Sequence, residues 1–381
     1  MPAVSGVLYG QVTKQEKEKY MFQLPIVVDA CITSECWTYI KTCILESSAE
    51  GRQWMAAHMN VFFDGKNVFF GENFKFYPAE YYNTALNFRP TDINEISSSN
   101  LVSSIRSTLN NGEYVVLYCN ISRIFAVCDK AVDIHEIMIF GYDDEKKVFF
   151  SSLLDNSIGR PKILNIPYQH LTDAYNDMKA YIIENREDAF WKTYSYYYPY
   201  TSIKAQVKEQ PPFNLLTQCL SKLEYEFYSD EWLQAVVKDN DTGRFLQGHT
   251  GVGCLKGILS VISLFLDGRE RRDNSSINLT LSLLRLYEHR KNMLRTLKLL
   301  DQLTEYSISS DQDPNEKPLE VYEDCCRRMK GCYMLSRKWD ITGKKPLLVK
   351  IAAECEDLYT IEKGRLGYAY KLGKDYIKEG L

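Results

Sequence analysis

Residues 133–150 read DIHEIMIFGYDDEKKVFF, and this stretch has the pattern of a β-hairpin. Residues 137–140 form an apolar run of strand length, 141–144 (Gly-Tyr-Asp-Asp) have the composition of a turn, and 147–150 form a second apolar run. His135 stands at the start of the first run. Because a titratable side chain at the mouth of a hairpin is well placed for catalysis, the stretch bears on both fold and function.

Toward the N-terminus, residues 36–45 have apolar side chains at helical spacing and predict a helix. Two short aromatic runs follow, 61–63 and 68–70, and the Asp-Gly-Lys sequence at 64–66 between them indicates a turn. The apolar face of the predicted helix consists of Trp37, Ile40, Ile44 and Leu45.

Between these runs and the hairpin, residues 99–109 again have helical spacing, and Asn-Asn-Gly at 110–112 is a typical helix stop. Residues 115–118 predict a buried strand. Helices and strands therefore alternate irregularly over about residues 20–200, which is an α+β pattern.

The second half of the chain has a different pattern. Residues 279–303 and 347–370 carry leucine, isoleucine and methionine at steps of three and four, and polar loops such as 309–318 separate the helices. We therefore expect a bundle of five or six helices. The aromatic, proline-containing segment 189–212 predicts a linker that packs on another surface.

Composition sets the broad class. A chain of 381 residues is too long for one ordinary core, so we expect two domains, residues 1–200 and residues 201–381. The net charge of −4 argues against a nucleic-acid partner. Because no signal peptide and no membrane-spanning run is recognisable, we expect a cytoplasmic protein with no membrane association.

The cysteine pattern bears on redox state and metals. Eleven cysteines are scattered without any Cys-x-x-Cys pair, which favours reduced thiols and gives no sign of a zinc site. We therefore expect no metal, and most of these thiols should be small buried hydrophobic groups.

Only five histidines are present, so a histidine-based site has few candidates. His58 lies beside Trp54 on a probable helix and favours a structural role. The sequence around His170 is typical of a helix start. His249 on a glycine-rich loop and His289 among charged residues of a helix are expected to be solvated, which leaves His135 as the candidate base.

A cysteine nucleophile is strongest at a helix N-terminus, where backbone N–H groups favour the thiolate. Two thiols qualify in the segment from Asp29 to Trp37: Cys31 precedes the Thr33-Ser34 pair expected to cap the helix, and Cys36 would lie in its first turn or further in. A cysteine on a helix, a histidine on a later strand and then an Asp or Asn is the order of papain-like hydrolases.

Several short blocks, in this order and spacing, resemble the N-terminal domain family of butirosin biosynthesis protein H. They are Leu24-Pro25-Ile26 with Cys31, Asn111 to Val116, Asp133-Ile134-His135, Gly141 to Lys146, and Ile166-Pro167-Tyr168 before Ala174-Tyr175. The likeness covers about residues 20–180, and the stretch Tyr287-Glu288-His289-Arg290 resembles the family's second domain more loosely.

The resemblance implies a papain-like first domain, similar to double-glycine-leader peptidases, followed by a helical domain. It also implies an acyltransferase of natural-product (antibiotic) biosynthesis that passes an acyl or aminoacyl group from a carrier-protein thioester to a small amine. Cys31 would attack the thioester, His135 would act as the base, and Asp155 would orient the imidazole ring. The enzyme would need no cofactor of its own, because the substrate arrives on a phosphopantetheinyl acyl or peptidyl carrier protein.

The sequence departs from the family at two points. Asp155 and Asn156 come two or three residues later than the expected aspartate, and the papain-type oxyanion glutamine is absent, so that backbone N–H groups or Gln23 would have to replace it. The Cys36-Trp37 step imitates papain-type helices, so the choice between Cys31 and Cys36 stays open. A leader-cleaving cysteine peptidase and an inactive, binding-only homologue are the alternatives.

Overall fold

The computed structural model describes residues 20–70, 82–125, 132–155, 160–185, 199–227, 236–238, 245–272, 275–304 and 318–380. Contacts between Cα atoms divide the chain into two compact units, and neither is continuous in sequence. We call residues 1–28 and 87–205 the sheet unit, and residues 29–86 and 206–381 the helical unit. Residues 29–86, which lie in the first of the two domains expected from the sequence, thus group with the C-terminal helices.

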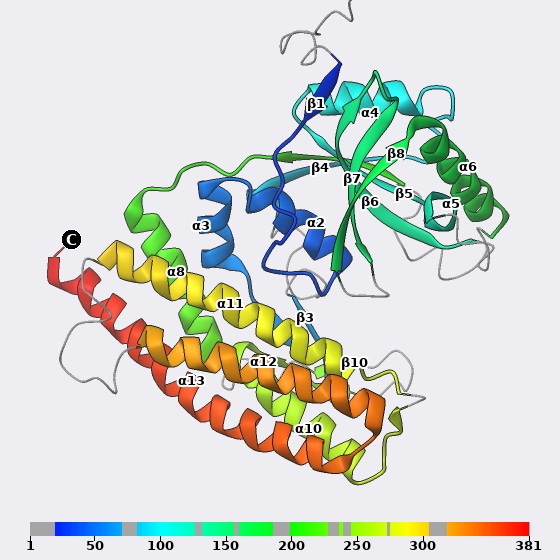
Figure 1. The fold of residues 1–381 in the computed structure, drawn as a ribbon. Helices are drawn as coiled ribbons and strands as arrows, with labels where there is room; N and C mark the ends of the chain where they lie inside the picture. Colours follow the sequence, from blue (N-terminus) through cyan, green and yellow to red (C-terminus); the bar gives the residue numbers. More distant parts are fainter. Residues whose placement is uncertain are drawn as a thin grey trace, which may run out of the picture. The chain divides into compact units, whose positions relative to one another are not determined.

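The sheet unit contains a seven-stranded sheet in the order β4-β9-β5-β6-β7-β8, with β1 pairing to β6 (Figure 1). Each pairing whose register is described is antiparallel. The strands are β1 (Met21–Gln23), β4 (Leu86–Thr91), β5 (Tyr114–Asn120), β6 (Ile134–Asp143), β7 (Val148–Asp155), β8 (Arg160–Pro167) and β9 (Tyr200–Ala205).

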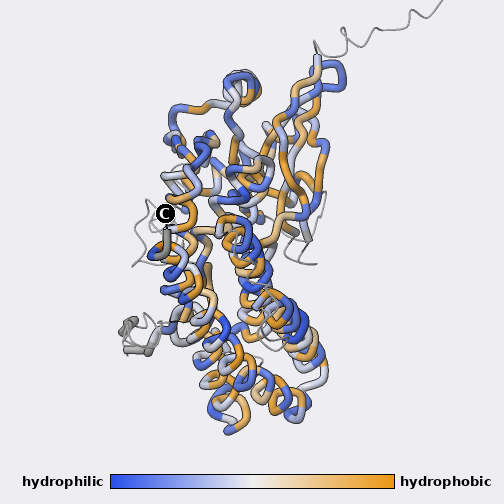
Figure 2. The backbone as a smooth tube through the Cα atoms, turned by 90° about the vertical axis from the view of Figure 1, so that its left-hand side faces the viewer, coloured by the Kyte–Doolittle hydropathy of each residue, from blue (hydrophilic) through white to orange (hydrophobic). Residues whose placement is uncertain are grey.

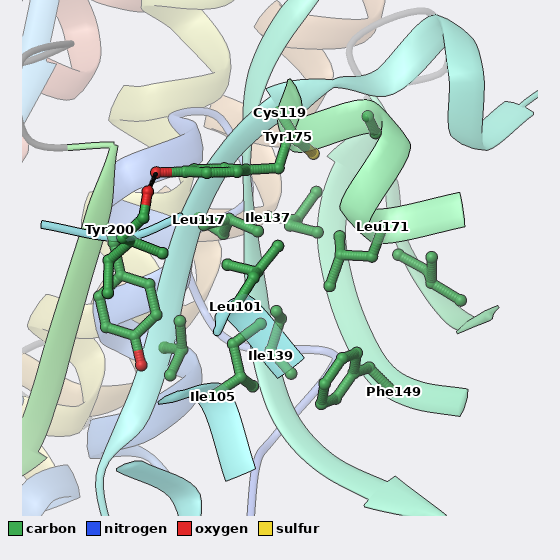
Figure 3. Packing of buried hydrophobic residues seen from close by; sticks show 14 of the residues in the cluster. Leu101, Ile105, Leu117, Cys119, Ile137, Ile139, Phe149, Leu171, Tyr175 and Tyr200 are labelled. Carbon is green, nitrogen blue, oxygen red and sulfur yellow. Dashed lines mark hydrogen bonds between the residues drawn. The ribbon is translucent and has the colours of Figure 1, made fainter. Parts of the chain in front are cut away.

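Within the described residues, three helices accompany this sheet: α4 (Leu101–Asn110), α5 (Ile121–Phe125) and α6 (Tyr168–Glu184). Two of them, α4 and α6, bury their apolar faces on the same side of the sheet (Figure 3). That core includes Leu101 and Ile105 from α4, Leu171 and Tyr175 from α6, and Ile137 from β6. Burial of this shared apolar surface is the main contribution that holds helices and sheet together.

The hairpin of 133–150 is confirmed, with its reversal slightly later than expected. Gly141 still belongs to β6, and the chain turns over residues 144–147, where Asp143 accepts a hydrogen bond of 3.0 Å from the N–H of Lys146. Gly141 stands at a bulge, and a Cβ there would lie 2.5 Å from the carbonyl oxygen of Phe22 on β1. This glycine therefore permits β1 to approach β6, and its presence is not a turn signal.

The linker expected over 189–212 was wrong for its central part. Tyr200–Ala205 forms β9, which pairs with β5 inside the sheet. Its tyrosine and β-branched residues are typical of strands. The tyrosines at 194–198 lie outside the described residues.

In the helical unit, the first elements are α2 (Cys36–Leu45) and α3 (Ala49–His58). A small sheet of order β12-β2-β3 follows, made of β2 (Val61–Phe63), β3 (Val68–Phe70) and β12 (His249–Thr250). The turn between β2 and β3 forms because the Asp64 carboxylate accepts hydrogen bonds from the N–H groups of Lys66 and Asn67. The helix and both strands predicted here are confirmed.

Five longer helices make up the rest of the helical unit within the described residues: α8 (Pro212–Phe227), α10 (Cys254–Leu266), α11 (Leu279–Thr304), α12 (Pro318–Thr342) and α13 (Lys345–Gly380). Helix α12 packs between α11 and α13, while α8 and α10 pack on α13 (Figure 1). The remaining short elements are η2 (Tyr82–Thr84), β10 (Val236–Lys238), β11 (Phe245–Gln247) and η4 (Gly251–Gly253).

Hydrophilic and hydrophobic residues alternate along the long helices of this unit (Figure 2). This is the pattern of helices with one buried and one solvated face. The structure is thus mixed α and β, with antiparallel sheets and a helical C-terminal region, as expected. Among the residues that the structure describes, no helix is both long and apolar enough to cross a bilayer.

Candidate active site

Helix α2 begins at Cys36, the first helical residue. Its N-cap is Glu35, whose backbone is extended. The expected cap by Thr33 and Ser34 was wrong, because both hydroxyls donate hydrogen bonds to the buried carboxylate of Glu288 on α11 instead. The segment before α2 is therefore held by another helix rather than by its own cap.

One stripe of α11 binds this segment and the helices after it. Arg285, Glu288, Asn292 and Arg295 follow one another at helical spacing and face the same side. Arg285 pairs with Glu35 at 2.9 Å, and Glu288 accepts from the N–H of Thr33 at 2.7 Å.

Farther along the same stripe, Asn292 donates to the carbonyl oxygen of Met55 on α3 at 2.9 Å, and Arg295 pairs with Glu46 just after α2 at 2.9 Å. The stripe thus contacts the chain before α2, after α2 and in α3. These hydrogen bonds and ion pairs hold α2 and the segments on either side of it against α11.

The surroundings of Cys31 oppose a role as nucleophile. Its side chain is only 1% exposed, and its N–H donates to the carboxylate of Glu46 at 2.7 Å. Burial raises the pKa of the Cys31 thiol well above its ordinary value, and the negative charge of Glu46 raises it further. Burial alone would raise the pKa of Glu46, but hydrogen bonds from Arg295 and Cys31 outweigh burial and lower it. The charges of Arg295 and Lys291 lower that pKa but do not outweigh burial and Glu46, so Cys31 favours the neutral thiol.

Cys36 differs from Cys31 in its burial and in its position. It is half-buried at the N-terminus of α2, where the helix dipole and the N–H groups of the first turn favour negative charge. The neighbouring Glu35 carboxylate is neutralised by Arg285, and the Arg285 guanidinium is close enough to Cys36 for their charges to interact. Of the two thiols singled out from the sequence, Cys36 is the one at a helix N-terminus and the less buried one, and both features favour its thiolate.

In the sheet unit, His135 lies near the start of β6 and pairs with Cys119 of β5. Its Nδ1 is 3.0 Å from the carbonyl oxygen of Glu136 and 3.5 Å from the Glu136 carboxylate. Because a carbonyl oxygen can only accept, Nδ1 carries the proton, and Nε2 of the neutral ring is left as the basic nitrogen. The imidazole and the Glu136 carboxylate are both largely buried, with 15% and 11% of their side chains exposed.

Asp155 is the last residue of β7 and pairs with Arg160 of β8 through the backbone. The β6–β7 pairing is described as far as Met138 and Ser152, and continuing that register by three residues would bring Asp155 opposite His135. Its side chain and Asn156 lie outside the described residues. The third-residue role of Asp155 thus stays a prediction, and Glu136 is a described carboxylate beside the ring that the sequence analysis missed.

Gln23, considered as an oxyanion donor, lies on β1 and is exposed. Cys31 and Cys36 belong to the helical unit, whereas Gln23, His135 and Asp155 belong to the sheet unit.

The other histidines have structural surroundings. His58 stacks on Trp54 with ring centroids 4.7 Å apart, as expected for a structural role, and His170 lies in the first turn of α6. His249 is half-buried on β12. The expectation that His289 is solvated was wrong: it is 3% exposed, and its Nε2 is 2.9 Å from the Glu226 carboxylate on α8. Burial lowers the pKa of His289, and the charge of Glu226 opposes that effect.

The ten cysteines in the described part of the chain are all free thiols, as the sequence pattern indicated. No family model matches this chain, and no curated protein is significantly similar to it.

Proposed function

We propose that the protein is a cysteine-dependent acyltransferase that forms an amide bond, with Cys36 as the nucleophile and His135 as the base. The observation that carries the proposal is the contrast between the two candidate thiols: Cys31 is buried against a carboxylate, and Cys36 is half-buried at a helix N-terminus near a guanidinium. The resemblance to the butirosin biosynthesis protein H family supports the same chemistry.

In this proposal Nε2 of His135 accepts the thiol proton of Cys36. The Cys36 thiolate attacks the carbonyl carbon of a carrier-bound thioester, and the carrier thiolate leaves with the proton returned by His135. An amine then attacks the acyl–Cys36 thioester, His135 takes the amine proton, and the amide and free thiolate are released.

Glu136 has a positioning role in this scheme. Its carbonyl oxygen holds the proton on Nδ1, and its carboxylate stabilises the imidazolium that forms when Nε2 is protonated. In this scheme backbone N–H groups at the N-terminus of α2 would stabilise the oxyanion, since helix N-termini favour negative charge.

The test is a single-turnover reaction with an acyl-pantetheine thioester, followed by mass spectrometry of the digested protein. We expect an acyl adduct on Cys36 that persists in Cys31→Ala and disappears in Cys36→Ala. Adding a small amine should release the adduct as an amide. An adduct on Cys31 alone, or none with any thioester tried, would contradict the proposal.

The same experiment separates the alternatives. Release of the adduct to water in preference to amines would indicate a hydrolase, and cleavage of peptides by the wild type but not by Cys36→Ala would indicate a leader-cleaving peptidase. Absence of any adduct together with binding of the thioester would indicate an inactive homologue.

A further inference from the structure

Helices α11 and α12 enclose a groove of about 420 Å³ that the proposed chemistry does not use. We call it the α11–α12 groove. Three cations of α11 and two of α12 line it: Lys291, Arg295, Lys298, Arg327 and Lys330. On a chain with a net charge of −4, five cations around one groove are a local concentration of positive charge.

Three of these cations already have acidic partners. Arg295 pairs with Glu46, Lys298 with Glu323 at 3.2 Å, and Arg327 with Asp324. Lys291 and Lys330 have no ion pair with any acid in the described part of the chain. The charge of Lys291 does act on Glu288, whose pKa it lowers against the larger effect of burial.

Part of the groove lining is apolar. Tyr287, Leu294 and Cys326 line it beside the cations, and the Lys291 ammonium lies 5.8 Å from the centre of the Tyr287 ring. A volume of several hundred cubic ångströms with a partly apolar lining and a few charged groups is typical of small-molecule sites. Its chemistry suits an organic anion with an uncharged chain.

We propose that the α11–α12 groove binds the phosphate-bearing part of the acyl donor. This inference rests on the proposed function, because a carrier-bound thioester is attached through a phosphorylated arm. Arg285 of α11 pairs with Glu35, the residue before Cys36. Measured along the helix axis from Arg285, Lys291 lies about 9 Å away and Lys298 about 20 Å away. A flexible arm of that length allows the phosphate to lie in the groove while the thioester reaches the end of α2.

The experiment measures binding by calorimetry in the Cys36→Ala variant, so that no acyl transfer is involved. The probes are 4′-phosphopantetheine, pantetheine and inorganic phosphate. We expect 4′-phosphopantetheine to bind more tightly than either of the others, and the affinity to fall with added salt. Reversing the unpaired cations, Lys291→Glu with Lys330→Glu, should weaken binding about tenfold or more, because each exchanged charge turns attraction into repulsion.

Lys350→Glu, at an exposed position of α13, is the matched control and should change the affinity less than about twofold. The Lys291→Gln with Lys330→Gln variant keeps the size of the side chains and should give an intermediate loss. Equal affinity for phosphorylated and unphosphorylated ligands, equal affinity for inorganic phosphate, or no effect of charge reversal would overturn the proposal. Since binding is measured without the thiol, a failure here is distinguishable from the absence of an adduct on Cys36.

Discussion

Glu288→Gln tests the attachment of the pre-helical segment to α11. The Glu288 carboxyl is buried, and burial raises its pKa from 4.5 to about 7 even though Ser34 and Thr33 donate hydrogen bonds to it. The folded state therefore holds a proton that the unfolded state releases at lower pH. The stabilisation is fully present below pH 4.5 and is lost as the pH rises through about 7. A difference of this size corresponds to about 3 kcal/mol in the free energy of unfolding.

Glutamine is neutral at every pH, so the variant should lack this contribution to the pH dependence. The assay is urea unfolding of wild type and Glu288→Gln at about pH 5 and about pH 8, followed by the fluorescence of Trp37 and the other tryptophans. Other titrating groups cancel in the comparison. We expect the free energy of unfolding of the wild type to fall by about 2.5 kcal/mol more than that of the variant between the two pH values, because part of the contribution is already lost at pH 5. The same pH dependence in both proteins would refute the account of Glu288 as a buried, proton-holding attachment point.

Two further substitutions test the packing of the helical unit. Arg290→Met breaks a buried pair in which the guanidinium contacts both oxygens of Glu362 at 2.6 and 2.8 Å. Chemical unfolding should show that the free energy of unfolding falls by about 3–5 kcal/mol, because the Glu362 charge is left buried without its partner. The second substitution Glu362→Leu should restore most of that loss. Gly257→Ala would bring a Cβ within 2.3 Å of the Phe63 ring and should lower stability by about 1–3 kcal/mol. Gly331→Ala on α12, where nothing lies within 4 Å, should instead be neutral or stabilising, and equal effects at both glycines would contradict this packing.

Much of the fold can be predicted from the local spacing of apolar residues and from turn residues. The helix at 36–45, the strands at 61–63 and 68–70 and the hairpin at 133–150 all form where apolar spacing and turn residues place them. These signals are local, since side-chain periodicity and turn chemistry depend on neighbours in the sequence. Strand β9 was missed because its tyrosines and prolines resemble a linker, and its partner β5 lies more than eighty residues earlier.

The candidate site is harder to predict, because the burial of its side chains and the residues they contact depend on segments far away in the sequence. The resemblance favours Cys31 as the nucleophile and leaves Cys36 open, whereas burial, the contact of Cys31 with Glu46 and the place of Cys36 at the start of α2 favour Cys36. His289 appears solvated among charged neighbours, yet its partner Glu226 is 63 residues away in the sequence. Glu136 was overlooked because adjacent strand residues usually point to opposite faces.

The most direct test of the central claim, that Cys36 rather than Cys31 is the reactive thiol and depends on His135, is site-resolved alkylation. Iodoacetamide is applied to the native protein at about pH 6, where ordinary thiols react slowly, and each cysteine is quantified by mass spectrometry. The account predicts fast modification of Cys36, slow modification of Cys31, and a marked slowing at Cys36 in His135→Ala. Preferential modification of Cys31, or a rate at Cys36 that does not change when His135 is replaced, would contradict it.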